Sequence, residues 1–309
     1  MVALVIIYNH KYDKNIPILE NIYKDQFSNI FHLVPFYTGE KENVIAVYEN
    51  SHYFQGYIVQ SYQILKSKGD FDHYFFIGDD LLLNPKINEE TYMSYFQIKR
   101  NDTFISEIFE TSSMSDKWLH SMKVIGYTLS VEGIEITKEL PSKEDILPRF
   151  HKLGLQTPYY SPQKVYAIPQ RKMYAKNLKG LYCYYKDKRR IENLYKIDRI
   201  ELEYPIACGY SDIVIIPKDE FKTFAHYCGI FAASRLFVEA AIPTSIILSC
   251  SNIKTEKDIK LKGKLFWGND RTEFEDEYKH SLHKLLNEFP NNILYFHPVK
   301  LSKWQIDTN

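Results

Sequence analysis

The sequence predicts an α/β fold in which helices flank a mostly parallel β-sheet, with an insertion in the middle of the chain. Strand-like apolar runs alternate with helix-like segments over residues 3–78, and regular patterns return after residue 200. Between them, residues 141–190 are rich in Pro, Tyr and Lys and show only weak periodicity. The 309 residues, 45% of them hydrophobic, suffice for a large core of this kind.

Four segments in the first half predict strands, and the first of them is a continuous apolar run, as expected of a strand that is covered on both faces. They are residues 3–8, 30–37, 43–49 and 73–78, and helical spacing of apolar side chains predicts helices over 15–27 and 54–67. Ligands of such sheets bind beyond the carboxyl ends of the strands. Tyr8 and Tyr48 lie at the ends of predicted strands, and Asn9 and the pair Asp79-Asp80 directly follow such strands, so we expect these residues at that edge.

The last third predicts a strand within 204–217, a helix over 220–241, a strand over 243–249, a helix over 275–289 and a final strand with a tail over 292–304. Residues 228–250 have the length of a membrane span. However, Arg235 and Glu239 would each cost about 2.5–3.5 kcal/mol at the bilayer centre, and Pro243 interrupts a single helix. We therefore expect a buried helix followed by a core strand.

Charge and cysteine usage narrow the class of protein. The 39 basic and 39 acidic residues balance, so no global field indicates a nucleic-acid partner. The four cysteines are far apart, which argues against a zinc site or a disulfide framework and favours the cytoplasm. Residues 170–190 are locally basic and aromatic. They are interpreted as a solvated face of the insertion, an acceptor lid or a contact with a membrane surface.

The stretch FDHYFFIGDDLLLNP, residues 71–85, carries a buried strand straight into two acids. Asp79 and Asp80 could cap a turn or helix. A polymerase-like site is a second interpretation, but it requires a strongly basic channel that this neutral chain does not indicate. In a third, the acids hold a divalent cation that clamps the diphosphate of a nucleotide sugar.

The strand-to-acid layout resembles the GT-A (Rossmann-like) fold of glycosyltransferases. Residues 71–85 are similar to the DxD-like motif of the β-3-glycosyltransferase and Fringe-like families, which often have a third acid where this chain has Gly78. The resemblance implies that Asp79 and Asp80 bind Mn²⁺ or Mg²⁺ and that Asp79 also meets the donor, a UDP-sugar. Asp70-Phe71-Asp72 matches DxD as well, but it precedes the strand and is set aside.

Two further segments resemble parts of such enzymes. Residues 204–215, YPIACGYSDIVI, resemble the segment that builds the acceptor side, where Gly209 would allow close approach of a sugar. Glu239 corresponds to an acid that deprotonates the acceptor hydroxyl, which favours inversion of the sugar, and Asp212 is the second candidate base. The alternative for Glu239 is an ion pair with Arg235, one helical turn earlier.

The tail FHPVKLSKW, residues 296–304, loosely resembles the H-x-G-x-x-K-P-W end of some retaining GT-A enzymes. This implies that His297 completes the metal shell, which would favour Mn²⁺, and that Lys300 meets the diphosphate. A purely structural histidine is the alternative. The tail points to retention, so the stereochemistry stays open.

Four other residues are candidates for donor binding. Tyr8 would stack on the nucleotide base and Asn9 would bond its edge, although Tyr8 suits the core equally well. Gln55 and Gly56 fall where the ribose or sugar of the donor would approach.

The resemblance implies three parts: a nucleotide-sugar-binding half (1–140), a basic, Tyr-rich insertion or lid (141–200), and an acceptor-binding half with the tail (201–309). The expected function is metal-dependent, hexosyltransferase-like transfer to a glycan or lipid-linked acceptor in bacterial surface polysaccharide or lipopolysaccharide synthesis. The expected location is the cytoplasm, at the inner face of the membrane. The alternatives are a non-catalytic nucleotide- or glycan-binding protein and a metal-dependent nucleotidyl or phosphoryl transferase.

Overall fold

The protein is built around one seven-stranded sheet with the order β12-β6-β11-β4-β1-β2-β3. The computed structural model describes residues 1–306 except 112–123, 125, 157–158 and 167. The strands are β1 (Val2–Ile7), β2 (Ile30–Pro35), β3 (Val44–Val47), β4 (His73–Gly78), β6 (Thr103–Ile105), β11 (Ile213–Pro217) and β12 (Ile253–Lys254). β11 is antiparallel to both of its neighbours, and the other pairs are parallel. The predicted α/β fold with a mostly parallel sheet is therefore confirmed.

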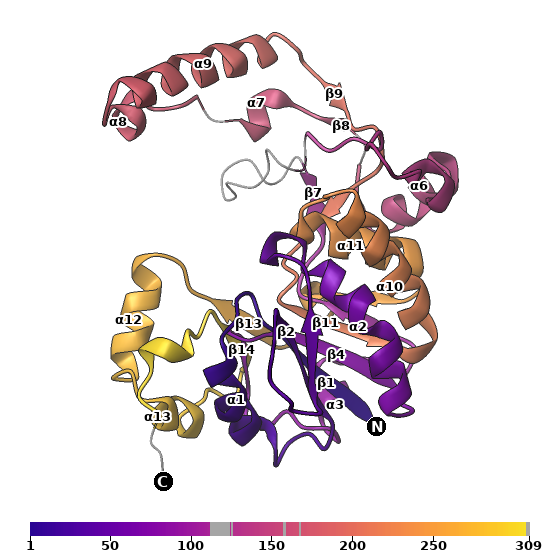
Figure 1. Ribbon diagram of the computed structural model, residues 1–309, viewed down its shortest axis with the longest axis vertical. Coiled ribbons are helices and arrows are strands. Elements are labelled where there is room, and N and C mark those ends of the chain that lie inside the picture. Colours follow the sequence, from indigo (N-terminus) through magenta and orange to yellow (C-terminus); the bar gives the residue numbers. More distant parts are fainter. Residues whose placement is uncertain (112–123, 125, 157–158, 167, 307–309) are drawn as a thin grey trace.

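β1 shows why its sequence is apolar without alternation. Val2, Leu4 and Ile6 pack into one hydrophobic core, and Ala3 and Val5 pack into a second core on the other face. Helices and a smaller sheet cover the two faces, so every position of this strand is buried (Figure 1).

The two faces are covered by different parts of the chain. One core includes side chains of α2 (Gln55–Lys68), α10 (Lys218–Ala233) and α11 (Val238–Ser249). The other includes α1 (Ile16–Tyr23), α3 (Tyr92–Tyr95), α12 (Asn269–Glu277), α13 (Leu282–Asn287) and a small sheet of β13 (Lys262–Leu265), β14 (Ile293–His297) and β5 (Leu82–Leu83). The strands predicted over 3–8, 30–37, 43–49 and 73–78, and the helices over 15–27 and 54–67, are confirmed to within a few residues.

The strand predicted over 243–249 is wrong, because these residues belong to α11. The preceding helix ends at Ala233, and Arg235 adopts a positive φ of 62° before α11 begins. Pro243 lies inside α11 although it has no N–H to offer the carbonyl of Glu239. The N–H of Gly209 donates to that carbonyl instead, at 2.9 Å. A long-range hydrogen bond thus makes the proline tolerable.

The helix predicted over 275–289 is also wrong in its extent. α12 ends at Glu277 and α13 begins at Leu282, because Lys279 and His280 both have a φ of 53°. A left-handed backbone of this kind interrupts an α-helix.

The middle of the chain leaves the sheet and forms small elements of its own. These are α5 (Ile136–Glu139), α6 (Lys143–Lys152), β8 (Tyr159–Tyr160), α7 (Pro162–Val165), α8 (Arg171–Tyr174), α9 (Leu178–Leu194) and β9 (Ile200–Glu201), while β7 (Phe109–Glu110) pairs with β10 (Ala207–Cys208). α8 and α9 project from the rest of the molecule (Figure 1). Single 3₁₀ turns occur at Asp13–Asn15, Ser51–Tyr53, Glu256–Asp258 and Leu301–Lys303. Within the described residues, no helix has the length and apolarity needed to cross a bilayer.

Candidate active site

Three aspartates meet at one edge of the sheet because β11 runs against its neighbours. β4 ends at Gly78, opposite Ile7 of the parallel β1, so Asp79 and Asp80 lie at the carboxyl edge. The antiparallel β11 begins at this same edge, and the Gly78 N–H donates to the carbonyl of Asp212 at 2.9 Å. Asp212, distant in sequence, is thereby placed beside the paired acids.

The small sheet brings His297 to the same place. β5 follows the acids directly and pairs antiparallel with β14, so that Phe296 lies opposite Leu82. His297, the last residue of β14, therefore arrives next to Asp80. The Val299 N–H donates to the Asp80 carbonyl at 2.6 Å and fixes the tail there.

The side chains form a compact, largely buried cluster. His297 Nε2 lies 3.3 Å from Asp80 Oδ1 and 3.6 Å from Asp212 Oδ1. A Cβ placed on Gly78 would lie 3.4 Å from Asp80 Oδ1 and 3.8 Å from Asp212 Oδ1. A third acid at position 78 would thus add its charge directly to this cluster, and the glycine avoids that repulsion.

Asp79 is held by neutral groups only. Its carboxylate accepts from the Asn9 N–H and from the Asn15 side-chain amide, both at 3.4 Å, and it is 5% exposed. Among the described residues it has no ion-pair partner. Burial, and then the charge of Asp80, raises the pKa of Asp79 to about 7.

The remaining charges of the cluster depend on one imidazole. Burial alone would lower the pKa of His297, but Asp212 and Asp80 outweigh it and raise this pKa to about 9. Burial would raise the pKa of Asp80, yet the hydrogen bond and charge of His297 hold it below its usual value. Burial keeps the pKa of Asp212 raised despite His297. At neutral pH His297 is therefore protonated, and its single positive charge faces both aspartates.

The donor set suits a hard divalent cation, because it offers several carboxylate oxygens with few partners of their own. As the side chains stand, no group of three or more His, Cys, Asp and Glu residues within the described ranges is arranged to hold a metal ion. The proton on His297 compensates part of the negative charge of Asp80 and Asp212, which a bound cation would otherwise compensate.

Glu239 does not pair with Arg235, so that alternative is wrong. Arg235 instead binds Glu49 at 2.9 Å and lies over the ring of Tyr53. Glu239 stands in the first turn of α11, and its buried Oε2 has no hydrogen-bond partner among the described residues. Burial, and then the charge of Asp212, raises the pKa of Glu239 to about 9. Its carboxyl group is therefore neutral at pH 7.

Three of the proposed donor-binding residues are placed in packing positions. Tyr8 is fully buried and its hydroxyl bonds His32 Nδ1 at 3.0 Å, so it belongs to the core and cannot stack on a base. Gln55 is fully buried and donates to the Leu236 carbonyl. A Cβ on Gly56 would lie 3.3 Å from Ala232 of α10. Helix packing, rather than a ligand, accounts for Gln55 and Gly56.

Accessible aromatic side chains lie near this edge, of which sequence reasoning expected Tyr48 there but missed Phe36 and Trp267. Phe36 and Tyr48 follow β2 and β3, are 54% and 66% exposed, and contact each other edge to face. Trp267 is 56% exposed and its ring lies edge-on to His297. The exposure of Trp267 is visible only in the structure, so the sequence held no signal for it. The role of Asn15 on Asp79 had no local signal beyond its position before a helix.

A cavity of 270 Å³ lies beside the cluster on the side of residues 204–215. Tyr210, Tyr295, Glu107 and Glu256 are among its lining residues, and Leu265 in its wall pairs with His297 across β13 and β14. Gly209 itself is approached by the Glu107 carbonyl, so backbone packing and not a sugar explains this glycine. Lys300 is exposed just beyond His297, and its charge helps to lower the pKa of Asp80.

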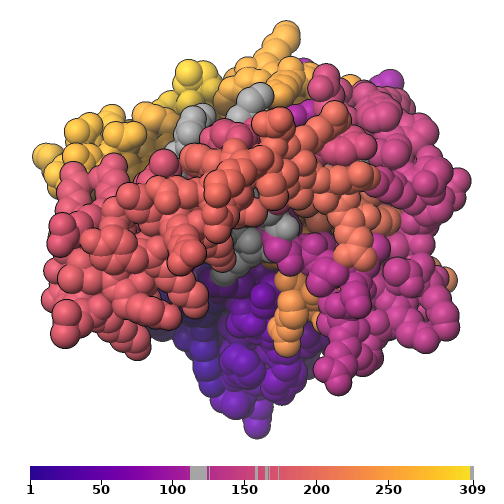
Figure 2. Space-filling view, turned by 90° about the horizontal axis from the view of Figure 1, so that it is seen from above, coloured from indigo at the N-terminus to yellow at the C-terminus, as the bar shows by residue number. Residues whose placement is uncertain are grey.

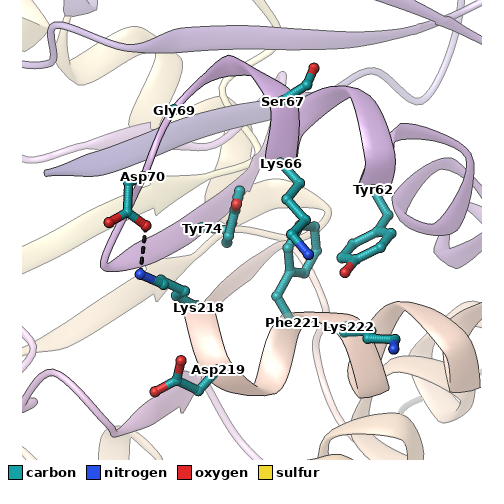
Figure 3. A pocket seen from close by; sticks show the side chains of 10 residues that line it. All are labelled: Tyr62, Lys66, Ser67, Gly69, Asp70, Tyr74, Lys218, Asp219, Phe221 and Lys222. Carbon is teal, nitrogen blue, oxygen red and sulfur yellow. Dashed lines mark hydrogen bonds and ion pairs between the residues drawn. The ribbon is translucent and has the colours of Figure 1, made fainter.

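A larger cavity of 530 Å³ lies at the opposite end of β4 (Figure 3). Lys66, Lys222 and the ion pair of Asp70 with Lys218 surround it, and it contains none of the cluster residues. Size alone therefore does not locate the candidate site.

Comparison with known proteins adds no assignment to this geometry. No protein-family model matches the chain, and no curated protein matches it significantly. The functional interpretation therefore depends on the cluster of Asp79, Asp80, Asp212 and His297.

Proposed function

We propose that this protein is a metal-dependent glycosyltransferase of the GT-A kind that uses a nucleotide-sugar donor. The observation that carries the proposal is the meeting of Asp79, Asp80, Asp212 and His297 at the carboxyl edge of a mostly parallel sheet. Ligands of such sheets bind at that edge. The cluster also holds more carboxylate than its own cation neutralises, which supports binding of a divalent ion.

Asp79 and Asp80 would hold Mn²⁺ or Mg²⁺, which when bound offsets the negative charge that develops on the departing nucleoside diphosphate. Lys300, which is exposed just beyond His297, would contact the same phosphates. Trp267, with Phe36 and Tyr48, offers exposed rings on which a base or sugar can stack. Asn9 stays a candidate for donor binding because it lies directly beside Asp79.

The acceptor would enter through the 270 Å³ cavity lined by Tyr210 and Tyr295. One base then removes the proton of the attacking hydroxyl, the acceptor oxygen bonds the anomeric carbon, and the bond to the diphosphate breaks. Glu239 is protonated at neutral pH, so we assign the role of base to Asp212 and that of hydrogen-bond donor to Glu239. A single base without a covalent intermediate favours inversion.

The test is a thermal-shift panel of UDP-, GDP- and CMP-sugars, each with and without Mn²⁺, on the native chain and on Asp80→Asn. A ligand that binds only the folded state raises its melting temperature. We expect one donor class to give an Mn²⁺-dependent shift that the variant loses, followed by transfer to a glycan or lipid-linked acceptor. No shift with any donor in a folded chain would refute the proposal.

The two other functions predict different results in this assay. If the protein binds a donor in the presence of metal but neither transfers nor hydrolyses it, a nucleotide- or glycan-binding protein is indicated. Turnover of nucleoside triphosphates in preference to sugar nucleotides would indicate a nucleotidyl or phosphoryl transferase.

A further inference from the structure

The arm, defined as residues 171–194 with helices α8 and α9, stands apart from the sheet (Figure 1). Viewed from above, it forms a large part of the surface on this side of the molecule (Figure 2). Asn177 caps the start of α9, and its side chain accepts from the Gly180 N–H at 2.8 Å. Tyr184 and Ile191 are buried on the inner face of α9, so its opposite face is turned outward.

The outward face of α9 carries a row of large side chains. Leu178, Tyr182 and Tyr185 are 86%, 69% and 57% exposed, and their spacing of four and three residues places them on one helical face. Scattered exposed apolar residues are common, but a row of three on one helix marks a contact surface.

This row is surrounded by positive charge. The arm, residues 171–194, contains eight Lys and Arg against one Asp and one Glu, a net charge of +6, while the whole chain is neutral. The rest of the chain therefore carries a net charge of −6. In the described part of the chain, no ion pair engages Lys179, Lys186 or Arg189. An anionic surface would attract the arm and repel the body, which defines an orientation.

We infer that the arm docks the protein on an anionic lipid bilayer, with the row Leu178, Tyr182 and Tyr185 in the interfacial region. Amphipathic helices with Lys and Arg beside apolar side chains lie in this way on membranes, and tyrosine favours the headgroup level. Single-stranded nucleic acid binds in basic grooves, whereas this face is the convex side of a helix. A symmetric contact between the same face of two copies would bring two strongly positive surfaces together and repel.

Co-sedimentation with vesicles tests the electrostatic half of the inference. The native chain should bind vesicles of mixed phosphatidylcholine and phosphatidylglycerol at physiological salt and should not bind pure phosphatidylcholine. Lys179→Gln with Lys186→Gln should weaken vesicle binding roughly thirtyfold, because each lysine near an anionic surface contributes about 1 kcal/mol to the binding free energy. The matched control is Lys66→Gln with Lys222→Gln, two exposed lysines on the body (Figure 3), which should bind like the native chain.

The apolar half is tested by Tyr182→Ser with Tyr185→Ser, which keeps every charge. We expect about a tenfold or greater loss of vesicle binding, and no loss for Ile64→Ser, an exposed apolar residue of α2. Circular dichroism checks that each variant folds. Unchanged binding by the tyrosine variant, tighter binding of single-stranded DNA than of vesicles, or a dimer that this variant dissociates would each overturn the inference.

Discussion

The two ends of β4 both carry a pair of aspartates, and the structure treats them in opposite ways. Asp70 and Asp72 precede the strand and are paired with cations. Asp72 binds the amino-terminal ammonium at 2.9 Å and Arg100 at 2.5 Å, and Asp70 binds Lys218 at 2.5 Å (Figure 3). These pairs complete the charge balance of the amino end without any ligand.

At the carboxyl end, Asp79, Asp80 and Asp212 are mostly buried. The imidazole of His297 is the ion-pair partner of both Asp80 and Asp212. The pKa of Asp72 is lowered by the amino-terminal ammonium, whereas that of Asp79 is raised by burial and by Asp80. Although residues 70–72 match the DxD pattern, their charge is already balanced. The comparison teaches that the carboxyl end of β4, unlike the amino end, has negative charge that no cationic side chain of the described residues balances.

Asp80→Asn should separate the two ends most strongly. It should lower kcat/KM with the donor identified by thermal shift by about a hundredfold or more, because it removes charge that stabilises the transition state. Asp72→Asn serves as the control and should leave kcat/KM near the native value. A similar loss of kcat/KM in both variants would show that the two ends of β4 do not differ in function.

Glu239→Gln should change how stability depends on pH. The folded pKa of about 9 lies above the ordinary 4.5, so the native chain loses stability as pH rises from 4.5 through 9. The neutral amide does not titrate, so its advantage over the native chain should grow by up to about 1.4 kcal/mol per pH unit. Urea unfolding at pH 6 and pH 9 measures this change. An equal difference in unfolding free energy between variant and native chain at both pH values would contradict the burial of Glu239.

Asp79→Asn should stabilise the protein at pH 8. The folded pKa of about 7 exceeds the ordinary value, so the native chain loses stability as pH rises through 7. The amide removes the buried charge but accepts one hydrogen bond fewer, which leaves a gain of about 1–2 kcal/mol. At pH 4 the gain should vanish. Destabilisation at both pH values would show that the two asparagine contacts outweigh the charge.

Asp72→Asn should have the smallest effect and the opposite sign. It removes two partly exposed ion pairs and should lower the free energy of unfolding by about 0.5–1 kcal/mol at neutral pH. Because the pKa of Asp72 is lowered, this contribution should be lost as pH falls through that pKa. High salt should shrink the difference between variant and native chain. A salt-independent loss would assign Asp72 another role.

The sequence by itself determined the fold class, most strands and helices of the first half, and the position of Asp79 and Asp80 at a strand end. These follow from local patterns, since a strand buried on both faces must be apolar throughout. Asp212 and His297 were named from resemblance, but only tertiary structure brought them to Asp80. That placement depends on the antiparallel direction of β11 and on the pairing of β14 with β5, which no local pattern encodes.

Tertiary structure also decided the points at which local patterns were wrong. Pro243 lies within a helix because a distant N–H satisfies the carbonyl that it leaves free. Arg235 meets Glu49 instead of Glu239 because a left-handed residue separates α10 from α11. Tyr8, Gln55 and Gly56 are buried because neighbouring elements pack over them. In each case a partner far away in the chain outweighed the local preference.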